Sequence, residues 1–143
     1  MKEDQKNKTS SSADKSFDLP KADILRGRIN FQRLFEGSAT VYSEKHLSLR
    51  FYTYSGEGYS CKMGFIVAKR LGKATERNYI KRILREAYRL HRHPLMTALN
   101  AASLGFHGAL MAKTVKIDFE TAEKEVVRLL SRVVDKLHAA FDL

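Results

Sequence analysis

The segment from Lys69 to Arg92 holds the residues whose types and spacing point most clearly to a chemistry. It contains nine lysine or arginine residues but only two glutamates, Glu76 and Glu86. So dense a set of cations favours a ligand that carries many phosphate groups, because each phosphate that a cation neutralises releases a condensed counterion. Arginine adds a planar fork of N–H donors that matches phosphate oxygens. The sequence therefore predicts a phosphate-binding surface made by Lys69, Arg70, Lys73, Arg77, Lys81, Arg82, Arg85, Arg89 and Arg92.

On a helical wheel these cations gather on one side of a helix. At about 100° per residue, the cations from Arg77 onward and the amide of Asn78 lie between about 0° and 140°. The like charges of Arg77, Lys81 and Arg85 repel one another at four-residue spacing, which favours a nucleic acid over a merely solvated face. An anionic membrane is disfavoured, because the opposite face must pack on the core. That face, between about 220° and 340°, consists of Ile80, Ile83, Leu84, Ala87 and Leu90.

The composition of the whole chain agrees with a nucleic-acid partner. The 143 residues include 26 Lys and Arg against 16 Asp and Glu, a formal net charge of +10. We find no paired carboxylates, no Ser/His/Asp order and no set of metal ligands, since His91 and His93 lack two further ligands for zinc. The sequence therefore predicts no catalytic side chain and no metal bound by the protein itself.

The beginning of the chain and the cysteine usage bear on its class. Residues 1–20 are polar and rich in Lys, Ser and Asp, which predicts a disordered tail before a single domain over residues 21–143. Cys61 is the only cysteine, so no intrachain disulfide can form, and its apolar surroundings favour an inert core residue. Neither a secretory signal nor an apolar run long enough for a membrane span is present, and we expect a cytoplasmic protein.

Hydrophobic periodicity predicts the elements that precede the basic segment. Apolar residues recur with helical spacing over 23–36, so a short helix is expected there. Residues 39–42 are expected to form a short strand, and residues 46–54 and 61–68 alternate as two longer strands. Turn residues at 55–58 join the two longer strands, which predicts an antiparallel hairpin.

The basic segment and the C-terminal third of the chain complete the expected fold. The basic helix is expected over residues 75–93, with Thr75 as its cap and a proline directly after it. Residues 95–104 are expected to form a short helix or a loop, residues 106–113 a strand, and Asp118 the cap of a final amphipathic helix. The apolar positions predicted for that helix are Phe119, Ala122, Val126, Leu129, Leu130, Val133, Val134 and Leu137. The sequence thus predicts an α+β two-layer sandwich, with helices packed on a small mixed or antiparallel sheet in the order α-β-β-(β)-α-β-α.

Three segments, in order along the chain, resemble the protein component of bacterial ribonuclease P. Residues 77–89, Arg-Asn-Tyr-Ile-Lys-Arg-Ile-Leu-Arg-Glu-Ala-Tyr-Arg, are similar to its signature helix, Arg-Asn-x-x-Lys-Arg-x-x-Arg followed by Glu-Ala and an aromatic residue. Residues 64–74 resemble its Gly-x-x-Val-(small)-Lys-(basic)-x-Gly-x-Ala strand and loop, and residues 31–35 its Phe-x-x-(aliphatic)-Phe helix. Tyr79 and Ala68 depart from the family, which often has Arg and commonly Ser at these places.

The resemblance implies an endoribonuclease whose catalyst is RNA and whose protein subunit helps to bind precursor tRNA. Endonucleolytic removal of the 5′ leader gives the mature tRNA 5′ end, Mg²⁺ is used by the RNA subunit, and one protein is expected per RNA. The implied RNA-binding residues are Lys69, Arg70, Lys73, Arg77, Asn78, Lys81, Arg82, Arg85 and Arg89. The implied leader-binding cleft contains Phe31, Phe35 and Tyr52, with Tyr54 as a further candidate. Helical spacing of the two phenylalanines also fits burial in the core.

The residues by themselves leave three other interpretations open. A ribosomal or other RNA-binding protein would have the same charge and helix but no dependence on a leader. A helix-turn-helix DNA-binding protein would need a short helix before the recognition helix, whereas a strand and a basic loop are predicted there. A self-sufficient nuclease would need acidic metal ligands that converge on one site.

Overall fold

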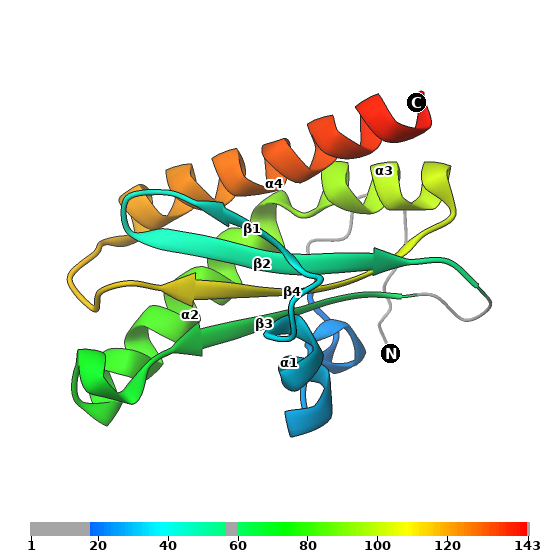
Figure 1. Cartoon of the computed structure of the whole chain (residues 1–143). Helices are drawn as coiled ribbons and strands as arrows, with labels where there is room; N and C mark the ends of the chain where they lie inside the picture. Colours follow the sequence, from blue (N-terminus) through cyan, green and yellow to red (C-terminus); the bar gives the residue numbers. More distant parts are fainter. Residues whose placement is uncertain (1–17, 57–59, 143) are drawn as a thin grey trace, which may run out of the picture.

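The computed structural model describes residues 18–56 and 60–142, which form a four-stranded sheet with helices on both faces (Figure 1). Residues 1–17 of the predicted tail lie outside the described residues. The α+β class is confirmed. The strands are β1 (Thr40–Ser43), β2 (Leu47–Tyr54), β3 (Cys61–Val67) and β4 (Gly105–Ala112). The helices are α1 (Arg28–Leu34), α2 (Ala74–His91), α3 (His93–Ala102) and α4 (Phe119–Phe141), with 3-10 turns at Lys21–Asp23 and Lys69–Leu71.

The strand β4 lies between β2 and β3, in a sheet of order β1-β2-β4-β3. It pairs antiparallel with β2 and parallel with β3, so the predicted hairpin of β2 and β3 is wrong. β4 is apolar and buried along almost its whole length, and such a strand is most stable between two neighbours. Alternation indicates where a strand lies, whereas its neighbours depend on contacts that are distant in sequence.

Alternation along β2 separates the two faces of the sheet. Leu47, Leu49 and Phe51 are buried in the main core, which the sheet forms with α2, α3 and α4. Arg50 and Tyr52 point to the opposite face, where α1 packs in a smaller cluster (Figure 1). The sheet therefore has one face covered by three helices and a second face that α1 covers in part.

The first helix is shorter than predicted. Periodicity favoured one helix over residues 23–36, but Ile24 forms a parallel bridge with Met63 and the Leu25 N–H donates to the Met63 carbonyl at 3.0 Å. Gly27 follows with φ of 94°, a left-handed conformation that interrupts a helix and that glycine adopts readily. Only Arg28–Leu34 is α-helical, because the preceding residues extend the sheet edge beside β3.

The basic helix α2 begins and ends slightly earlier than predicted. Its first residue is Ala74, and the N–H of Lys73 donates to Oε1 of Glu76 at 2.8 Å, so Glu76 and not Thr75 satisfies the helix start. It ends at His91, and α3 then begins at His93 with Pro94 in its first turn, where proline is tolerated. Residues 95–102 are thus helical.

The buried faces of the two long helices follow the periodicity of the sequence. Ile80, Ile83, Leu84 and Ala87 of α2 are buried as predicted, whereas Leu90 is only partly buried. The predicted cap of α4 is confirmed, because Oδ1 of Asp118 accepts a hydrogen bond from the Thr121 N–H at 2.8 Å. Most predicted core positions of α4 are buried, namely Ala122, Val126, Leu129, Leu130, Val133 and Leu137, while Phe119 and Val134 are partly buried.

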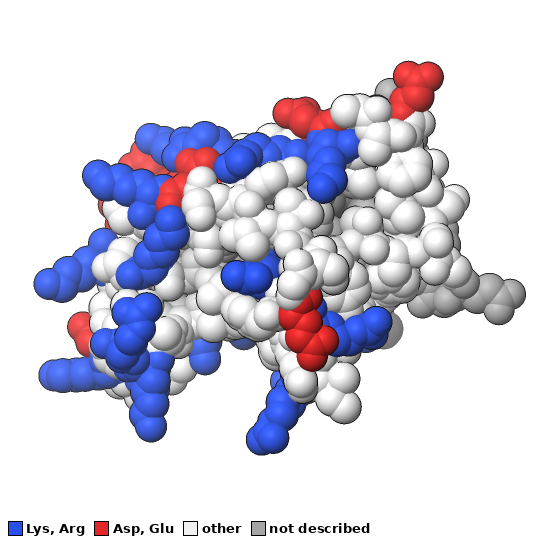
Figure 2. All heavy atoms as spheres, viewed as in Figure 1, with Lys and Arg blue, Asp and Glu red and all other residues white. Residues whose placement is uncertain are grey.

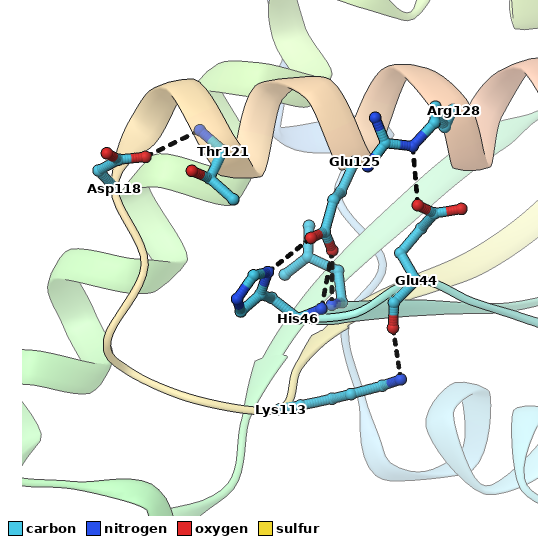
Figure 3. Close-up of polar contacts among 8 residues, drawn as sticks. Glu44, His46, Lys113, Asp118, Thr121, Glu125 and Arg128 are labelled. Carbon is cyan, nitrogen blue, oxygen red and sulfur yellow. Dashed lines mark hydrogen bonds and ion pairs between the residues drawn. The ribbon is translucent and has the colours of Figure 1, made fainter.

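A buried carboxylate joins α4 to the turn between β1 and β2 (Figure 3). Glu125 is 2% exposed and accepts hydrogen bonds from the backbone N–H groups of His46 at 3.0 Å and Leu47 at 2.9 Å. Its second oxygen lies 2.6 Å from Nδ1 of His46. These contacts satisfy an otherwise costly buried charge and fix the turn against the helix. Periodicity does not predict this contact, because it joins residues that are 79 positions apart in the sequence.

Two smaller expectations concern Cys61 and membranes. The Cys61 thiol lies 3.5 Å from the Tyr88 hydroxyl, and burial raises its pKa, which keeps it protonated and agrees with an inert residue. Burial also raises the pKa of Tyr88 well above its ordinary value. In the part of the chain that the structure describes, no helix combines the length and apolar character needed to cross a membrane.

Candidate RNA-binding site

The cationic face of α2 points away from the core, because its opposite face packs under the sheet. Figure 2 shows that Lys and Arg gather at the edge of the molecule where α2 and the turn before it begin. Six predicted residues are exposed: Lys69, Arg70, Lys73, Asn78, Arg82 and Arg85. Three are partly exposed: Arg77, Lys81 and Arg89. The structure therefore brings all nine predicted RNA-binding residues to one side of one element and its preceding turn.

Arg77 fixes the turn that precedes the helix. Its Nη1 donates to the carbonyl of Gly72 at 2.9 Å and lies 3.4 Å from the carbonyl of Lys69. A Cβ atom at Gly72 would lie 2.8 Å from Oε1 of Glu76 and 3.0 Å from Cγ2 of Val115, so the glycine leaves room for these two side chains. The cations of the turn, Lys69 and Arg70, are thereby held at a fixed position beside α2.

The arginines in the middle of α2 lie beside aromatic rings or an acidic side chain. The Arg82 guanidinium is 5.6 Å from the centroid of Tyr79, and that of Arg85 is 5.7 Å from Phe65. Arg89 donates to both oxygens of Glu86, at 3.0 and 2.6 Å, and this bond lowers the pKa of Glu86. The charge of Arg89 is thus partly neutralised, and Arg82 and Arg85 are the exposed cations of the helix itself.

Arg92 does not belong to the cationic face, which corrects the wheel prediction. Its side chain is buried, and Nη2 donates to Oδ2 of Asp23 at 2.6 Å. Its guanidinium also lies 5.7 Å from the centroid of Tyr88. The α-helix has ended at His91, and the chain turns Arg92 inward to meet a residue 69 positions earlier. A wheel extended past the helix end cannot describe this position.

The second face of the sheet carries a cluster of rings around Tyr52. The Tyr52 hydroxyl lies 2.9 Å from Nδ1 of His107, its pairing partner on β4. The Tyr54 ring is 6.3 Å from that of Tyr52 and 5.2 Å from that of His107, measured between centroids. Sequence analysis missed His107, because only the register between β2 and β4 places it beside the two tyrosines.

The two phenylalanines of the first helix have different environments. Phe31 packs over the sheet, and a Cβ atom at Gly64 would lie 2.6 Å from its ring, so this glycine makes room for the phenylalanine. Phe35 is 47% exposed, and the Arg50 guanidinium lies 4.7 Å from the centroid of its ring. Phe31 therefore belongs largely to the smaller core cluster, whereas Phe35 presents an accessible ring at the rim of the same face.

Cations are interleaved with these rings. The Arg33 guanidinium lies 5.6 Å from the Tyr52 centroid, and Arg50 also donates to the Leu34 carbonyl at 3.4 Å. Burial, together with the charges of Lys62 and Arg33, lowers the pKa of His107, so this imidazole is neutral at pH 7. Rings alternating with cations suit single-stranded nucleic acid. We call this set the aromatic sheet face: Arg33, Phe35, Arg50, Tyr52, Tyr54, Lys62 and His107.

A groove of about 810 Å³ between α3 and α4 is separate from both surfaces. It is lined by apolar residues together with His91, His93 and His138, and Nε2 of His91 lies 2.8 Å from Oε2 of Glu123. Within residues 18–56 and 60–142, no group of three or more His, Cys, Asp or Glu side chains is arranged to hold a metal ion.

Comparisons with known proteins identify this architecture. The family model for ribonuclease P matches residues 19–134. The ribonuclease P protein component of Porphyromonas gingivalis is 31% identical over 120 residues, which cover 82% of this chain and 88% of the relative. The structure of the RNase P protein from Staphylococcus aureus has a TM-score of 0.62 at 21% identity and covers 79% of this chain and 96% of that one. The RNase P protein from Thermotoga maritima has a TM-score of 0.58 at 27% identity, with 76% and 96% covered.

These matches define the class as protein subunits of a ribonucleoprotein that processes tRNA. The chain belongs to the ribonuclease P protein component family. Membership implies partnership with ribonuclease P RNA, and it confirms the resemblance that the three sequence segments predicted.

Proposed function

We propose that the protein binds the catalytic RNA of ribonuclease P through α2 and the 5′ leader of precursor tRNA through the aromatic sheet face. It thereby promotes the endonucleolytic cleavage that gives the mature tRNA 5′ end. One observation carries the proposal: a rigid cationic helix face and a ring-lined sheet face occur on the same small domain of the ribonuclease P family. The first surface suits structured RNA and the second suits a single strand.

On the helix, the cations replace diffuse counterions of the RNA. Arg82 and Arg85 are exposed and held on a packed helix, so little reorganisation is needed when phosphate binds. The exposed amide of Asn78 differs from the arginines, because an amide both donates and accepts and suits a base edge or a 2′-hydroxyl. Fixed protein charge should lower the Mg²⁺ concentration at which the RNA folds and cleaves.

On the sheet, exposed rings stack on leader bases. Phe35, Tyr52 and Tyr54 offer ring surface, and stacking contributes about 1–3 kcal/mol per base with little sequence preference. Arg33 and Arg50 lie close enough to pair with the leader phosphates while they remain over these rings. A surface of this kind fits precursors whose leaders differ in sequence.

The chemical step is assigned to the RNA. In this proposal Mg²⁺ held by the RNA subunit would supply an activated water, and no side chain of the protein acts as acid, base or nucleophile. The protein contributes substrate affinity and electrostatic screening. One protein per RNA is expected, since the chain offers a single copy of each surface.

The test is cleavage of a precursor tRNA by a bacterial ribonuclease P RNA at low Mg²⁺, with native protein, Arg82→Ala or Phe35→Ala. We expect stimulation by the native protein, a loss with Arg82→Ala for all substrates, and a loss with Phe35→Ala only when a leader is present. Lys21→Ala, an exposed cation elsewhere, serves as the control. Binding without any stimulation, across several catalytic RNAs, would instead support an RNA-binding protein of another system.

A further inference from the structure

A second row of cations lies on α4, apart from the cationic face of α2 and from the aromatic sheet face. Lys124, Arg128, Arg132 and Lys136 recur every four residues, as Arg77, Lys81 and Arg85 do on α2. Successive members of such a row share one side of a helix and are about 6 Å apart along its axis. Figure 2 shows Lys and Arg along α4, on the side of the molecule opposite to α1.

The row is held across the edge strand β1. Nε of Arg128 donates to Oε1 of Glu44 at 2.8 Å (Figure 3). The Arg132 guanidinium lies 4.2 Å from the centroid of Tyr42, and its Nη1 is 3.4 Å from the carbonyl of Ser43. Nζ of Lys136 lies 3.3 Å from Oγ1 of Thr40. The side chains are therefore partly ordered before any ligand binds, which lowers the entropy cost of binding.

Simple solvation explains this row poorly. Opposite charges at four-residue spacing stabilise a helix, and Lys124 has such a partner in Glu120 at 3.7 Å, but the next three positions of the row, Arg128, Arg132 and Lys136, are all cations. Arg132 and Lys136 contact a ring, a carbonyl and a hydroxyl, which leave their positive charge in place. Asp135 lines the groove between α3 and α4. Like charges held in this way favour a polyanion.

The row is continuous with the basic start of α2. The loop between β4 and α4 carries the exposed Lys113 and Lys116, and its Val115 side chain would lie 3.0 Å from a Cβ atom at Gly72, just before α2. Nζ of Lys113 donates to the carbonyl of Glu44, whose carboxylate pairs with Arg128 (Figure 3). Positive charge therefore passes from α2 around the end of the sheet to α4.

We infer that this α4–β1 surface is a second binding site for the phosphate backbone of structured RNA, and that it extends the contact made by α2 onto a neighbouring RNA segment. The surface consists of Lys113, Lys116, Lys124, Arg128, Arg132 and Lys136. It binds backbone and does not read bases, because its nearby rings, such as Tyr42, are covered by Arg132. The inference rests on the proposed function, since it takes the RNA to be the one that α2 binds.

The test measures affinity and its salt dependence for the native protein and three double variants. Arg132→Gln/Lys136→Gln removes two charges from the α4 row but keeps aliphatic carbons over Tyr42 and Phe51. Lys116→Gln/Lys124→Gln also removes two charges, at exposed positions away from those rings. The charge-matched control, Lys21→Gln/Arg28→Gln, lies at and before α1. Each is assayed with a ribonuclease P RNA alone and with precursor tRNA alone, and thermal unfolding verifies the fold.

Each α4 double variant should lose about tenfold in affinity at moderate salt, and the slope of log affinity against log salt should fall by about 1 for each lost contact. Arg132→Lys should retain both the affinity and the salt slope of the native protein, because it keeps the positive charge. A loss with the ribonuclease P RNA supports the inference, and a loss only with precursor tRNA would overturn it, because the surface would then contact the substrate and not the RNA that α2 binds.

Unchanged affinity and slope in both α4 variants, or an equal loss in the control, would overturn the inference. Arg82→Gln/Arg85→Gln on α2 serves as the reference. If that variant loses affinity while the α4 variants do not, only the second surface is wrong. If the native protein binds neither RNA, the proposed function fails and this inference fails with it.

Discussion

The cationic face of α2 and the aromatic sheet face differ in how much of the chain builds them. The first comes from one continuous segment, residues 69–89, in which the cations of α2 share a helix face by periodicity and the preceding turn adds three more. The second takes Phe35 from the end of α1, Tyr52 from β2, Lys62 from β3 and His107 from β4. A helical surface can be assembled by local spacing, whereas a sheet surface exists only when distant strands adopt the correct register.

The comparison also shows that residue type does not decide role within either region. Arg82 is exposed on α2, while Arg92 is buried in an ion pair with Asp23. Phe35 is accessible, while Phe31 packs over Gly64. In each pair one residue is available to a ligand and the other stabilises the fold, and burial separates them. Substitutions within each pair can test that separation.

The largest expected effect is that of Phe31→Ala on stability. Removing a ring packed between α1 and the sheet should lower the free energy of unfolding by about 2–3 kcal/mol, less than for a fully buried phenylalanine. Phe35→Ala should change it by less than about 0.5 kcal/mol. Urea unfolding of both variants provides the measurement. Equal losses in the two variants would show that both rings belong to the core.

Arg92→Ala should have the next largest effect. It removes the partner of Asp23, which is partly exposed, and should lower the free energy of unfolding by about 2 kcal/mol. Arg82→Ala should leave stability within about 0.5 kcal/mol of the native protein. It should weaken catalytic-RNA binding and reduce the salt slope by about 1. If folded Arg92→Ala protein lost as much RNA affinity as Arg82→Ala, Arg92 would be an RNA-binding residue, and its exclusion from the cationic face would be wrong.

Gly64→Ala tests the contact between α1 and β3. The added Cβ would lie 2.6 Å from the Phe31 ring, and the resulting displacement should cost about 1–2 kcal/mol. Gly64→Ala should also lower the affinity for the leader, while the affinity for catalytic RNA should stay unchanged. A double-mutant cycle with Phe31→Leu supplies the control, because a smaller side chain at 31 should reduce the cost of Gly64→Ala. Strictly additive effects of the two changes would contradict the contact.

The smallest expected effect concerns pH. The pKa of His107 is lowered below its ordinary value of 6.5, so below that pH the unfolded chain binds a proton more readily than the folded protein. The free energy of unfolding should therefore decrease as the pH falls from about 7.5 to about 5. The decrease should be smaller in His107→Gln, because that variant lacks this titrating group. Chemical unfolding at both pH values measures the difference. The four other histidines are present in both proteins, and an identical pH dependence would contradict the shifted pKa.

Much of the fold could be predicted because it depends on local spacing. The buried residues of α2 and α4, the Asp118 cap and the existence of each strand follow from periods of 3.6 and 2 and from capping chemistry. The errors lie where a distant residue intervenes. β4 separates β2 from β3, and Ile24 joins the sheet edge beside Met63 instead of starting a helix.

The sequence by itself determined that a row of cations lies opposite an apolar face, since both are properties of one helix, and its motifs indicated the family. Only the tertiary structure decided which of these groups are available to RNA. It buried Arg92 against Asp23, placed His107 beside Tyr52 and packed the β4–α4 loop against Gly72, just before α2, and against Glu44, the partner of Arg128 on α4. The physical reason is that burial, strand register and continuity of charge depend on which distant segments meet, and those contacts are made only when the chain folds.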